Sequence, residues 1–291
     1  MKSISVIVPV LNNPDSLEML LDRVNTMGKN NDLQIEVILI DDCSKDNTPE
    51  IIKNLAEQNP QQIKYCILNE NKGQHFSTLL GLHCSTGSIV ITIDDDLQYA
   101  PENIPDLIDL LNQYPESIVY GIPIHKQGVS WFRLFTALIL HKTTVMLGLT
   151  KKKLSSFRCM GRNTKNLIVS SAHLFVNIEH ISIENKIMHQ NISVPHYTRT
   201  TSKSRYTNLK LFVFVVKSIF SYTAFSFILL FMLVLAAITG GYFLRQTNGI
   251  ILTGFIGLCV VLSLLITFVG FYYRKPVSFA EYIKESNCHD F

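Results

Sequence analysis

Short apolar runs alternate with amphipathic stretches along the first 125 residues of the chain. The runs are rich in β-branched and aliphatic residues, as buried strands are. Between them, apolar residues recur every three or four positions, as on the buried side of a helix. The expected strands are 4–10, 36–40, 63–68, 88–93 and 117–121. The expected helices are 15–27, one with Thr48 as its N-cap and Pro49 as its first helical residue, 76–84 and 101–113. This alternation predicts an α/β fold with a mainly parallel sheet covered by helices.

Polar residues gather where three of the predicted strands end. Residues 11–13 (LNN) follow the first strand, Asp41 and Asp42 the second, and residues 94–96 (DDD) the fourth. Ligands bind beyond the carboxyl ends of the strands in sheets of this kind. We therefore expect these three polar clusters to meet in one site.

The three consecutive aspartates, Asp94, Asp95 and Asp96, are the strongest chemical signal. Crowded carboxylates are costly unless a cation or solvent compensates them. Alternation along an extended segment lets Asp94, Asp96 and Gln98 share one side, and their oxygen ligands suit Mg²⁺ or Mn²⁺. The alternative is a solvated turn that caps the helix near Pro101. Convergence with the other strand ends favours the metal site.

The composition of the chain is apolar for a soluble protein. Of 291 residues, 47% are hydrophobic and 17% charged, which points to membrane segments. No charged residue occurs between Lys217 and Arg245, or between Arg245 and Arg274. A membrane span needs about 20 apolar residues. We predict transmembrane helices near 222–244 and 250–273, in preference to a buried helical hairpin of a soluble protein.

The flanking charges predict the orientation of these spans. Basic residues lie before the first span and after the second, so the positive-inside rule places both flanks in the cytoplasm. The expected organisation is a cytoplasmic domain (1–215), a membrane hairpin (216–275) and a cytoplasmic tail (276–291) of a multi-pass inner-membrane protein. Residues 129–149 are apolar with interspersed basic residues, so we favour a helix at the membrane interface over a core helix. The net charge of +3 argues against a nucleic-acid partner.

The six cysteines are scattered along the chain. They show neither CxxC spacing nor a cysteine–histidine pattern typical of zinc sites. Reduced thiols in a cytosolic domain are the simplest interpretation.

Several short segments together resemble family 2 glycosyltransferases, which have the GT-A fold. The aspartate segment is similar to the DADLQ motif of the branch that contains dolichol-phosphate mannose synthase and undecaprenyl-phosphate sugar transferases. Two C-terminal membrane helices also fit bacterial members of that branch. The matching segments are 8–13 (VPxYNE), 40–46 (DDGSxD), 71–87 (NxG…G…G), 94–98 (DADLQ), 155–158 (GSFR) and 199–205 (RxxGxSK).

The resemblance implies roles for individual residues. A divalent metal, Mg²⁺ or Mn²⁺, would sit on the donor diphosphate, and arginines would engage phosphates. The alternative for Arg199, Lys203 and Arg205 is a juxtamembrane basic cluster attracted to anionic lipid. The two roles can coexist, and we favour phosphate binding for Arg199 and Arg205. The implied residues are Pro9, Leu11, Asn13, Ile40 and Asp42 for the nucleotide; Asp94 and Asp95 for the donor; Asp94, Asp96 and Gln98 for the metal; Arg199 and Arg205 for donor phosphates; and Arg133 near the donor and acceptor phosphates.

The implied function is an inverting, metal-dependent transfer of a sugar from a nucleoside diphosphate sugar to undecaprenyl phosphate. The acceptor phosphate is already anionic and needs no protein base. A sugar-hydroxyl acceptor would need one, for which Glu179 and Glu184 are candidates, although both are equally typical of surface residues. The alternatives are a glycosyltransferase of the same fold that extends a glycan, and a membrane-anchored binding scaffold. Homo-oligomerisation is left open.

The chain departs from the family pattern at five places. Leu11 stands for Tyr, Asn13 for Glu, Cys43 for Gly, Asp95 for Ala, and Pro123 for an Arg near the donor. Because these positions surround the expected donor site, they weaken any inference about which sugar is bound.

Overall fold

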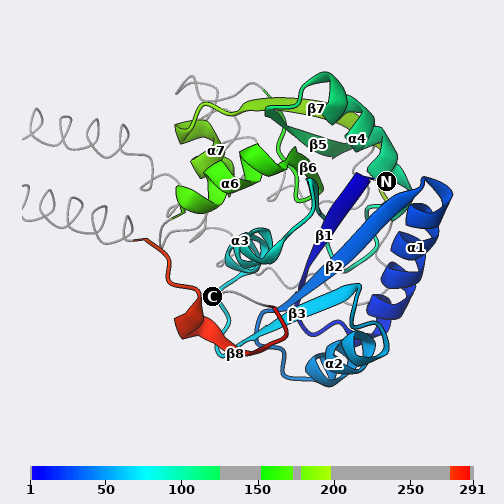
Figure 1. Ribbon diagram of the computed structural model, residues 1–291, viewed down its shortest axis with the longest axis vertical. Helices are drawn as coiled ribbons and strands as arrows, with labels where there is room; N and C mark the ends of the chain where they lie inside the picture. The colour runs from blue at the N-terminus through cyan, green and yellow to red at the C-terminus, as the bar shows by residue number, and fades with distance from the viewer. Residues whose placement is uncertain (1, 125–151, 173–177, 198–275, 289–291) are drawn as a thin grey trace, which may run out of the picture. The chain divides into compact units, whose positions relative to one another are not determined.

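The computed structural model describes residues 2–124, 152–172, 178–197 and 276–288 (Figure 1). The chain divides into two compact units. The first contains 1–172, 176–204 and 278–291, and the second contains 173–175 and 205–277. The second unit has only two described residues, so the account below concerns the first.

Helices and strands alternate through the first 123 residues, and shorter elements follow. In chain order the described elements are β1 (Lys2–Val10), η1 (Pro14–Ser16), α1 (Leu17–Asn30), β2 (Leu33–Asp41), α2 (Thr48–Gln58), β3 (Ile63–Leu68), α3 (Gln74–Cys84), β4 (Ile89–Thr92), η2 (Pro101–Asn103), α4 (Ile104–Gln113), β5 (Ser117–Pro123), β6 (Arg158–Gly161), α6 (Arg162–Ser170), α7 (Ile178–Glu184), β7 (Met188–Val194), η3 (Ala280–Tyr282) and β8 (Ile283–Ser286).

The strands described form one eight-stranded sheet in the order β7-β5-β6-β4-β1-β2-β3-β8. β1 is parallel to β2 and β4, β2 is parallel to β3, and β5 is parallel to β7. β6 runs antiparallel between β4 and β5, and β8 runs antiparallel to β3. The predicted α/β fold with a mainly parallel sheet is confirmed.

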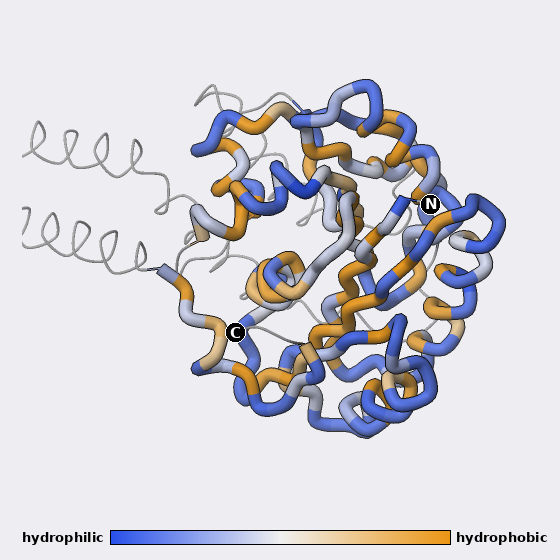
Figure 2. The backbone as a smooth tube through the Cα atoms, viewed as in Figure 1, coloured by the Kyte–Doolittle hydropathy of each residue, from blue (hydrophilic) through white to orange (hydrophobic). Residues whose placement is uncertain are grey.

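Helices cover both faces of the sheet. α1, α2 and α4 pack on one face, and α3 and α6 pack on the other (Figure 1). Val6 and Val8 of β1 belong to the core under the first layer, while Ile7 between them meets α3. A Cβ atom at Gly81 would lie 2.3 Å from Ile7 Cγ2, so glycine allows α3 to approach β1 closely. Figure 2 shows the hydrophobic residues concentrated on the strands and the sheet-facing sides of the helices.

Each of the four parallel strands β1 to β4 is followed by a loop that contains a residue with positive φ. Asn12 (φ 45°), Cys43 (φ 63°) and Leu97 (φ 58°) follow β1, β2 and β4, and Gly73 (φ 89°) precedes α3. Cys43 therefore has a left-handed backbone conformation, at a position where the family pattern has glycine. Such a conformation costs a non-glycine residue about 1–2 kcal/mol.

The elements beyond residue 123 differ most from the sequence prediction. β6, α6, α7, β7 and β8 had not been predicted. Residues 283–286, which had been assigned to a tail, form β8 at the edge of the sheet beside β3 (Figure 1). The N-cap of α2 is Asn47, not Thr48, which is the first helical residue.

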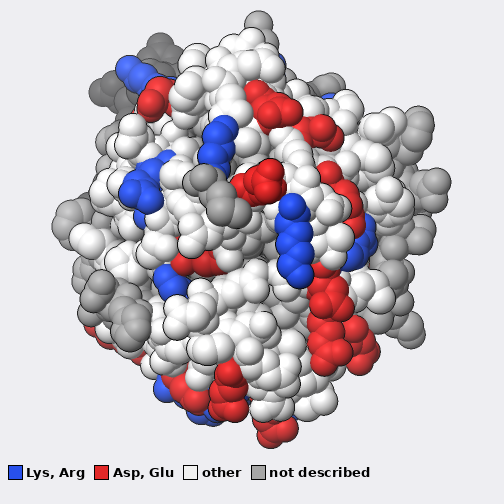
Figure 3. Space-filling model, turned by 45° about the vertical axis from the view of Figure 1, so that its right-hand side comes forward, with Lys and Arg blue, Asp and Glu red and all other residues white. Residues whose placement is uncertain are grey.

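The predicted membrane segments, 222–244 and 250–273, and the predicted interface helix, 129–149, lie outside the described residues. Among the residues that are described, no helix is long and apolar enough to cross a membrane. The face in Figure 3 carries acidic and basic side chains interspersed among uncharged ones.

Candidate active site

The carboxyl ends of β1, β2, β3 and β4 lie along one edge of the sheet. Val10 at the end of β1 pairs with Asp41 of β2, and Asp41 pairs with Ile67 of β3. On the other side of β1, Ile7 pairs with Thr92, the last residue of β4. The parallel register therefore gathers the residues that follow these four strands into one region, as the sequence pattern predicts.

Asp42 fixes the loop between β3 and α3. Its carboxylate accepts the backbone N–H of Lys72 at 2.7 Å and that of Gly73 at 2.9 Å, and its carbonyl accepts from Asn71 Nδ2 at 3.1 Å. Asp42 is 4% exposed. Burial raises the pKa of Asp42 to about 6, against the opposing effect of the two N–H donors. Asp42 thus joins the second and third strand ends.

Asn13 joins the first strand end to the aspartate segment. Its backbone N–H donates to Thr48 Oγ1 at 3.1 Å, and its Nδ2 donates to the Asp95 carbonyl at 3.0 Å. Ser16 Oγ donates to the same carbonyl at 2.5 Å. Asn13 is 3% exposed, so these bonds are shielded from water.

Asp94 is oriented by two side chains from other elements. Gln74 Nε2, from the first turn of α3, donates to one carboxylate oxygen. Ser156 Oγ, from the segment before β6, donates to the other at 2.5 Å. These contacts set the direction of the Asp94 carboxylate, and a carboxylate oxygen can accept a hydrogen bond and bind a cation at the same time.

Asp96 and Gln98 form a tight turn after Asp94. Asp96 Oδ1 accepts the backbone N–H of Gln98 at 3.1 Å. Gln98 in turn bonds to Tyr197, whose N–H donates to the Gln98 carbonyl at 2.9 Å. Gln98 Nε2 lies 3.5 Å from the Tyr197 carbonyl, which turns the amide nitrogen towards that segment.

Arg158 and Glu179 form an ion pair whose side chains are 5% and 12% exposed. Arg158 Nε donates to Glu179 Oε1 at 3.0 Å, and Arg158 Nη1 donates to Thr92 Oγ1 at 3.3 Å. His75 Nδ1 lies 3.5 Å from Glu179 Oε2. Burial acts to raise the pKa of Glu179, but the charges of Arg158 and His75 outweigh it and the pKa lies below its usual range. Glu179 is therefore held as a carboxylate whose charge is already compensated.

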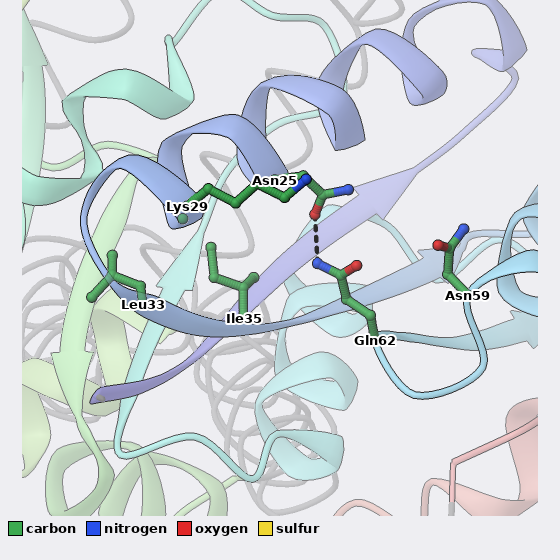
Figure 4. Close-up of a pocket in the computed structure, with 7 residues that line it drawn as sticks. Asn25, Lys29, Leu33, Ile35, Asn59 and Gln62 are labelled. Carbon is green, nitrogen blue, oxygen red and sulfur yellow. Dashed lines mark hydrogen bonds between the residues drawn. The ribbon is translucent and has the colours of Figure 1, made fainter.

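A pocket of about 240 Å³ lies away from this region. It is formed by the end of α1, the start of β2 and the loop before β3 (Figure 4). Gln62 Nε2 donates to Asn25 Oδ1 across it at 2.5 Å. The start of β2 and the loop before β3 lie at the amino ends of the parallel strands. The aspartates lie at the carboxyl ends, so the pocket and the aspartates are at opposite ends of the strands.

Most of the chain matches one protein family. The model of glycosyl transferase family 2 matches residues 5–209. This chain belongs to glycosyl transferase family 2. The match begins within β1, extends past β7 and includes every described residue of the candidate site.

Two curated relatives have the same name. The chain is 32% identical over 216 residues to the undecaprenyl-phosphate 4-deoxy-4-formamido-L-arabinose transferase of Edwardsiella ictaluri, covering 72% of this chain and 64% of that protein. It is 34% identical over 170 residues to the enzyme of the same name from Aeromonas hydrophila, covering 58% and 51%. The matched region is thus about half to two thirds of the length of these relatives.

Solved structures share the GT-A fold of this family 2 member. Glucosyl-3-phosphoglycerate synthase from Mycobacterium tuberculosis, crystallised with Mn²⁺ and UDP-glucose, superposes with a TM-score of 0.53 at 19% identity, covering 77% of this chain and 79% of that chain. Mannosyl-3-phosphoglycerate synthase from Rubrobacter xylanophilus gives 0.55 at 14% identity, covering 75% and 72%. At these identities the likeness concerns the fold alone.

The structure locates some of the residues implied by the family 2 resemblance, but not all of them. Asn13, Asp42, Asp94, Asp95, Asp96 and Gln98 lie at the strand ends described above, with Pro9 and Leu11 partly buried at the end of β1. Ile40 is fully buried in β2, so no atom of it reaches the surface. Pro123 ends β5 and pairs with Val194. Arg133, Arg199 and Arg205 lie outside the described residues.

Two residues that orient Asp94 were missed by the sequence analysis. Gln74 and Ser156 both occur in segments that match family motifs, but neither had been given a role. In the sequence, the signal for these two residues is their place in the motifs, next to Gly73 and two residues before Arg158. Their contact with Asp94 depends on how α3 and the segment before β6 pack around β4, which a local pattern does not contain.

The donor set of this family 2 site fits a hard divalent cation. Asp94, Asp96 and Gln98 offer oxygen atoms, which Mg²⁺ and Mn²⁺ prefer. Among the described residues, one group of three side chains of the cysteine, histidine, aspartate or glutamate type brings its ligand atoms within 4.8 Å of one another. The three aspartates do not form that group. Mg²⁺ commonly takes only one or two carboxylates and completes its shell with substrate phosphates and water.

Proposed function

We propose that this chain is an inverting, metal-dependent glycosyltransferase that moves a sugar from a nucleoside diphosphate sugar to undecaprenyl phosphate at the cytoplasmic face of the membrane. The observation that carries the proposal is the gathering of polar residues at the carboxyl ends of four parallel strands. The chain is a family 2 member, and its curated relatives are named undecaprenyl-phosphate 4-deoxy-4-formamido-L-arabinose transferases. That edge is where α/β sheets bind ligands.

The contacts of Glu179 support a phosphate acceptor over a sugar hydroxyl. A hydroxyl acceptor needs a general base with a pKa near the working pH. Glu179 is paired with Arg158 and His75, and its pKa is lowered. A phosphate oxygen that is already anionic needs no proton removed before it attacks the anomeric carbon.

On the donor side, Asp94, Asp96 and Gln98 would hold Mg²⁺ or Mn²⁺. When bound, the cation would neutralise charge that grows on the leaving nucleoside diphosphate. Gln74 and Ser156 fix the direction of the Asp94 carboxylate before the donor arrives. A solved structure of the same fold contains Mn²⁺ and UDP-glucose, which supports this assignment. Arg133, Arg199 and Arg205 remain proposed phosphate contacts.

The membrane arrangement is also a proposal. We retain a catalytic domain (1–215) with an interface helix (129–149), two spans within 216–275, and a cytoplasmic tail (276–291). β7 and β8 lie in one sheet, so the chain between residues 194 and 283 has both ends on one side of any membrane. An even number of crossings satisfies that condition, and two agree with the apolar stretches.

A transfer assay tests the proposal. Full-length protein in detergent is incubated with undecaprenyl phosphate, Mn²⁺ and a panel of radiolabelled nucleotide sugars, and the lipid extract is counted. We expect one donor to label the lipid. Asp96→Asn should lower the rate at least about 100-fold. The matched control is Asp109→Asn, on the exposed side of α4, which should transfer normally.

Two other results would point to the rival functions. Labelled oligosaccharide without labelled lipid, for any donor in the panel, would rule out the lipid-phosphate acceptor. Metal-dependent binding of a nucleoside diphosphate, measured by calorimetry, would count against the scaffold, and its absence would contradict the proposed donor site.

A further inference from the structure

Three cysteines from distant parts of the sequence meet on the side of the sheet covered by α3. Cys66 lies in β3, Cys84 is the last residue of α3, and Cys288 follows β8. Cys66 Sγ lies 3.9 Å from Cys84 Sγ and 3.4 Å from Cys288 Sγ. All three sulfur atoms lie within 4.8 Å of one another. The sequence spacing of these residues gave no sign of this cluster.

We propose that Cys66, Cys84 and Cys288 form a binding site for one thiophilic divalent metal ion, Zn²⁺ in the first place. In a tetrahedral site, Zn–S bonds of about 2.3 Å place the sulfur atoms about 3.8 Å apart. The separations of 3.4 Å and 3.9 Å lie on either side of that value. Three thiolates fill three positions and leave the fourth for water or another ligand.

The surroundings of the cluster suit a structural ion. Cys66 is fully buried and Cys84 is 8% exposed, while Cys288 is partly exposed and provides the side from which an ion can enter. Sulfur ligands select softer metals than the oxygen ligands of Asp94, Asp96 and Gln98. The cysteine site is therefore distinct in chemistry from the proposed donor site.

A disulfide explains the arrangement less well. It would join two sulfur atoms at about 2.0 Å and leave the third unexplained. Cys66 lies near both of the other thiols, without selecting one partner. A dithiol also needs an oxidant, whereas binding a cation releases only protons.

The consequence of such an ion would be to hold the C-terminal segment on the domain. Besides pairing with β3, this segment contacts the loop after β3: Asn69 N donates to the Tyr282 carbonyl at 3.0 Å, and Lys72 Nζ lies 4.0 Å from the Tyr282 ring centre. The same loop is fixed by Asp42. A metal bound to Cys66, Cys84 and Cys288 would therefore stabilise β8 and the loop together.

The test measures metal on the full-length protein, purified in detergent with a thiol reductant. After loading with Zn²⁺ and removal of excess ion, elemental analysis should find about one zinc per chain. Cys66→Ser, Cys84→Ser and Cys288→Ser should each lower that content at least tenfold. Cys159→Ser, a buried thiol outside the cluster, and Cys43→Ser, a partly exposed one, are matched controls that should keep it. Asp96→Asn should also keep it.

Cobalt gives a readout that does not depend on how the variants fold. Wild-type protein loaded with Co²⁺ should show the near-ultraviolet charge-transfer band of cobalt–thiolate bonds. Absence of that band, or zinc content in Cys288→Ser equal to wild type, would overturn the proposal. Protein purified without reductant that binds no zinc and lacks two titratable thiols would show that a disulfide forms instead. None of these results depends on glycosyl transfer.

Discussion

Asn13 stands where the family pattern has a glutamate, and its amide group gives a reason for the difference. Asn13 Nδ2 donates to the Asp95 carbonyl, which also accepts from Ser16. An ionised glutamate carries no side-chain N–H and cannot make that bond. At this position the chain therefore has a residue that fixes the backbone of the aspartate segment.

The Asn13 contact can be removed with almost no change in shape. Asn13→Asp replaces the donor with a carboxylate facing the Asp95 carbonyl in a buried setting, which should lower the free energy of unfolding by about 1–3 kcal/mol. Denaturant unfolding of the full chain measures it. Asn12→Asp is the matched control, because Asn12 uses its Oδ1 as an acceptor from Lys45 N–H, and aspartate keeps that acceptor. Equal stability of the two variants would contradict the role given to Asn13.

Asp42 should make stability depend on pH. Its pKa is raised from the ordinary value of 3.8 to about 6, so the protonated form is favoured in the folded state. This contribution to stability is full below about pH 4 and is lost as pH rises through about 6, with an upper limit of about 3 kcal/mol. The unfolding free energy of wild type minus that of Asp42→Asn should fall across this window. A difference that stays constant from pH 4 to 7 would exclude a raised pKa.

At the scale of elements, apolar runs predicted β1 to β5 because those strands are buried on both faces. β6 and β8 are four residues long and mix polar with apolar side chains, as in Arg158–Gly161 and Ile283–Ser286. Their strand conformation depends on pairing with β4, β5 and β3, which lie far away in sequence. A local pattern does not contain such pairing.

The candidate site divides in the same way. Residues that directly follow apolar strands, such as Asn13, Asp42 and the aspartates, could be predicted to converge because parallel strands share an edge. Gln74, Ser156 and the cysteine cluster could not, since each depends on the packing of a helix or an edge strand against the sheet.

The attachment of β8 makes a prediction at this scale. Asn287 extends the pairing with β3: its Oδ1 accepts Tyr65 N–H at 2.6 Å, and its Nδ2 donates to the Ile63 carbonyl at 3.2 Å. Asn287→Ala should speed hydrogen exchange of β3 and β8 roughly tenfold or more, because it leaves a strand N–H unpaired. Glu285→Gln, which removes the charge paired with Lys53 and keeps an oxygen that can accept from the Tyr65 hydroxyl, should have a smaller effect. The reverse order would show that charge, and not backbone pairing, attaches β8.

For the molecule as a whole, the order of elements constrains the path of the chain. β8 follows the two predicted spans in sequence, yet it completes a sheet whose other strands precede them. Both ends of the proposed membrane hairpin therefore belong to the same compartment, which is also what the positive-inside rule predicts from the flanking basic residues.

Reporter insertions test this topology. A green fluorescent protein fused after residue 291 should be fluorescent, and alkaline phosphatase at the same place should be inactive, because the proposal places that end in the cytoplasm. Alkaline phosphatase inserted after Arg245 should be active, since the proposal places the connection between the two predicted spans in the periplasm. Inactive phosphatase at Arg245 would contradict two crossings.

The central claim is that a single sugar is transferred to a lipid phosphate with release of a nucleoside diphosphate. The most direct measurement is mass spectrometry of the products formed by the full-length protein from undecaprenyl phosphate and its preferred nucleotide sugar. The account predicts undecaprenyl phosphate carrying one sugar through a phosphodiester, and one nucleoside diphosphate released for each lipid. Release of a nucleoside monophosphate with a lipid diphosphate, or a sugar found only on a glycan hydroxyl, would contradict it.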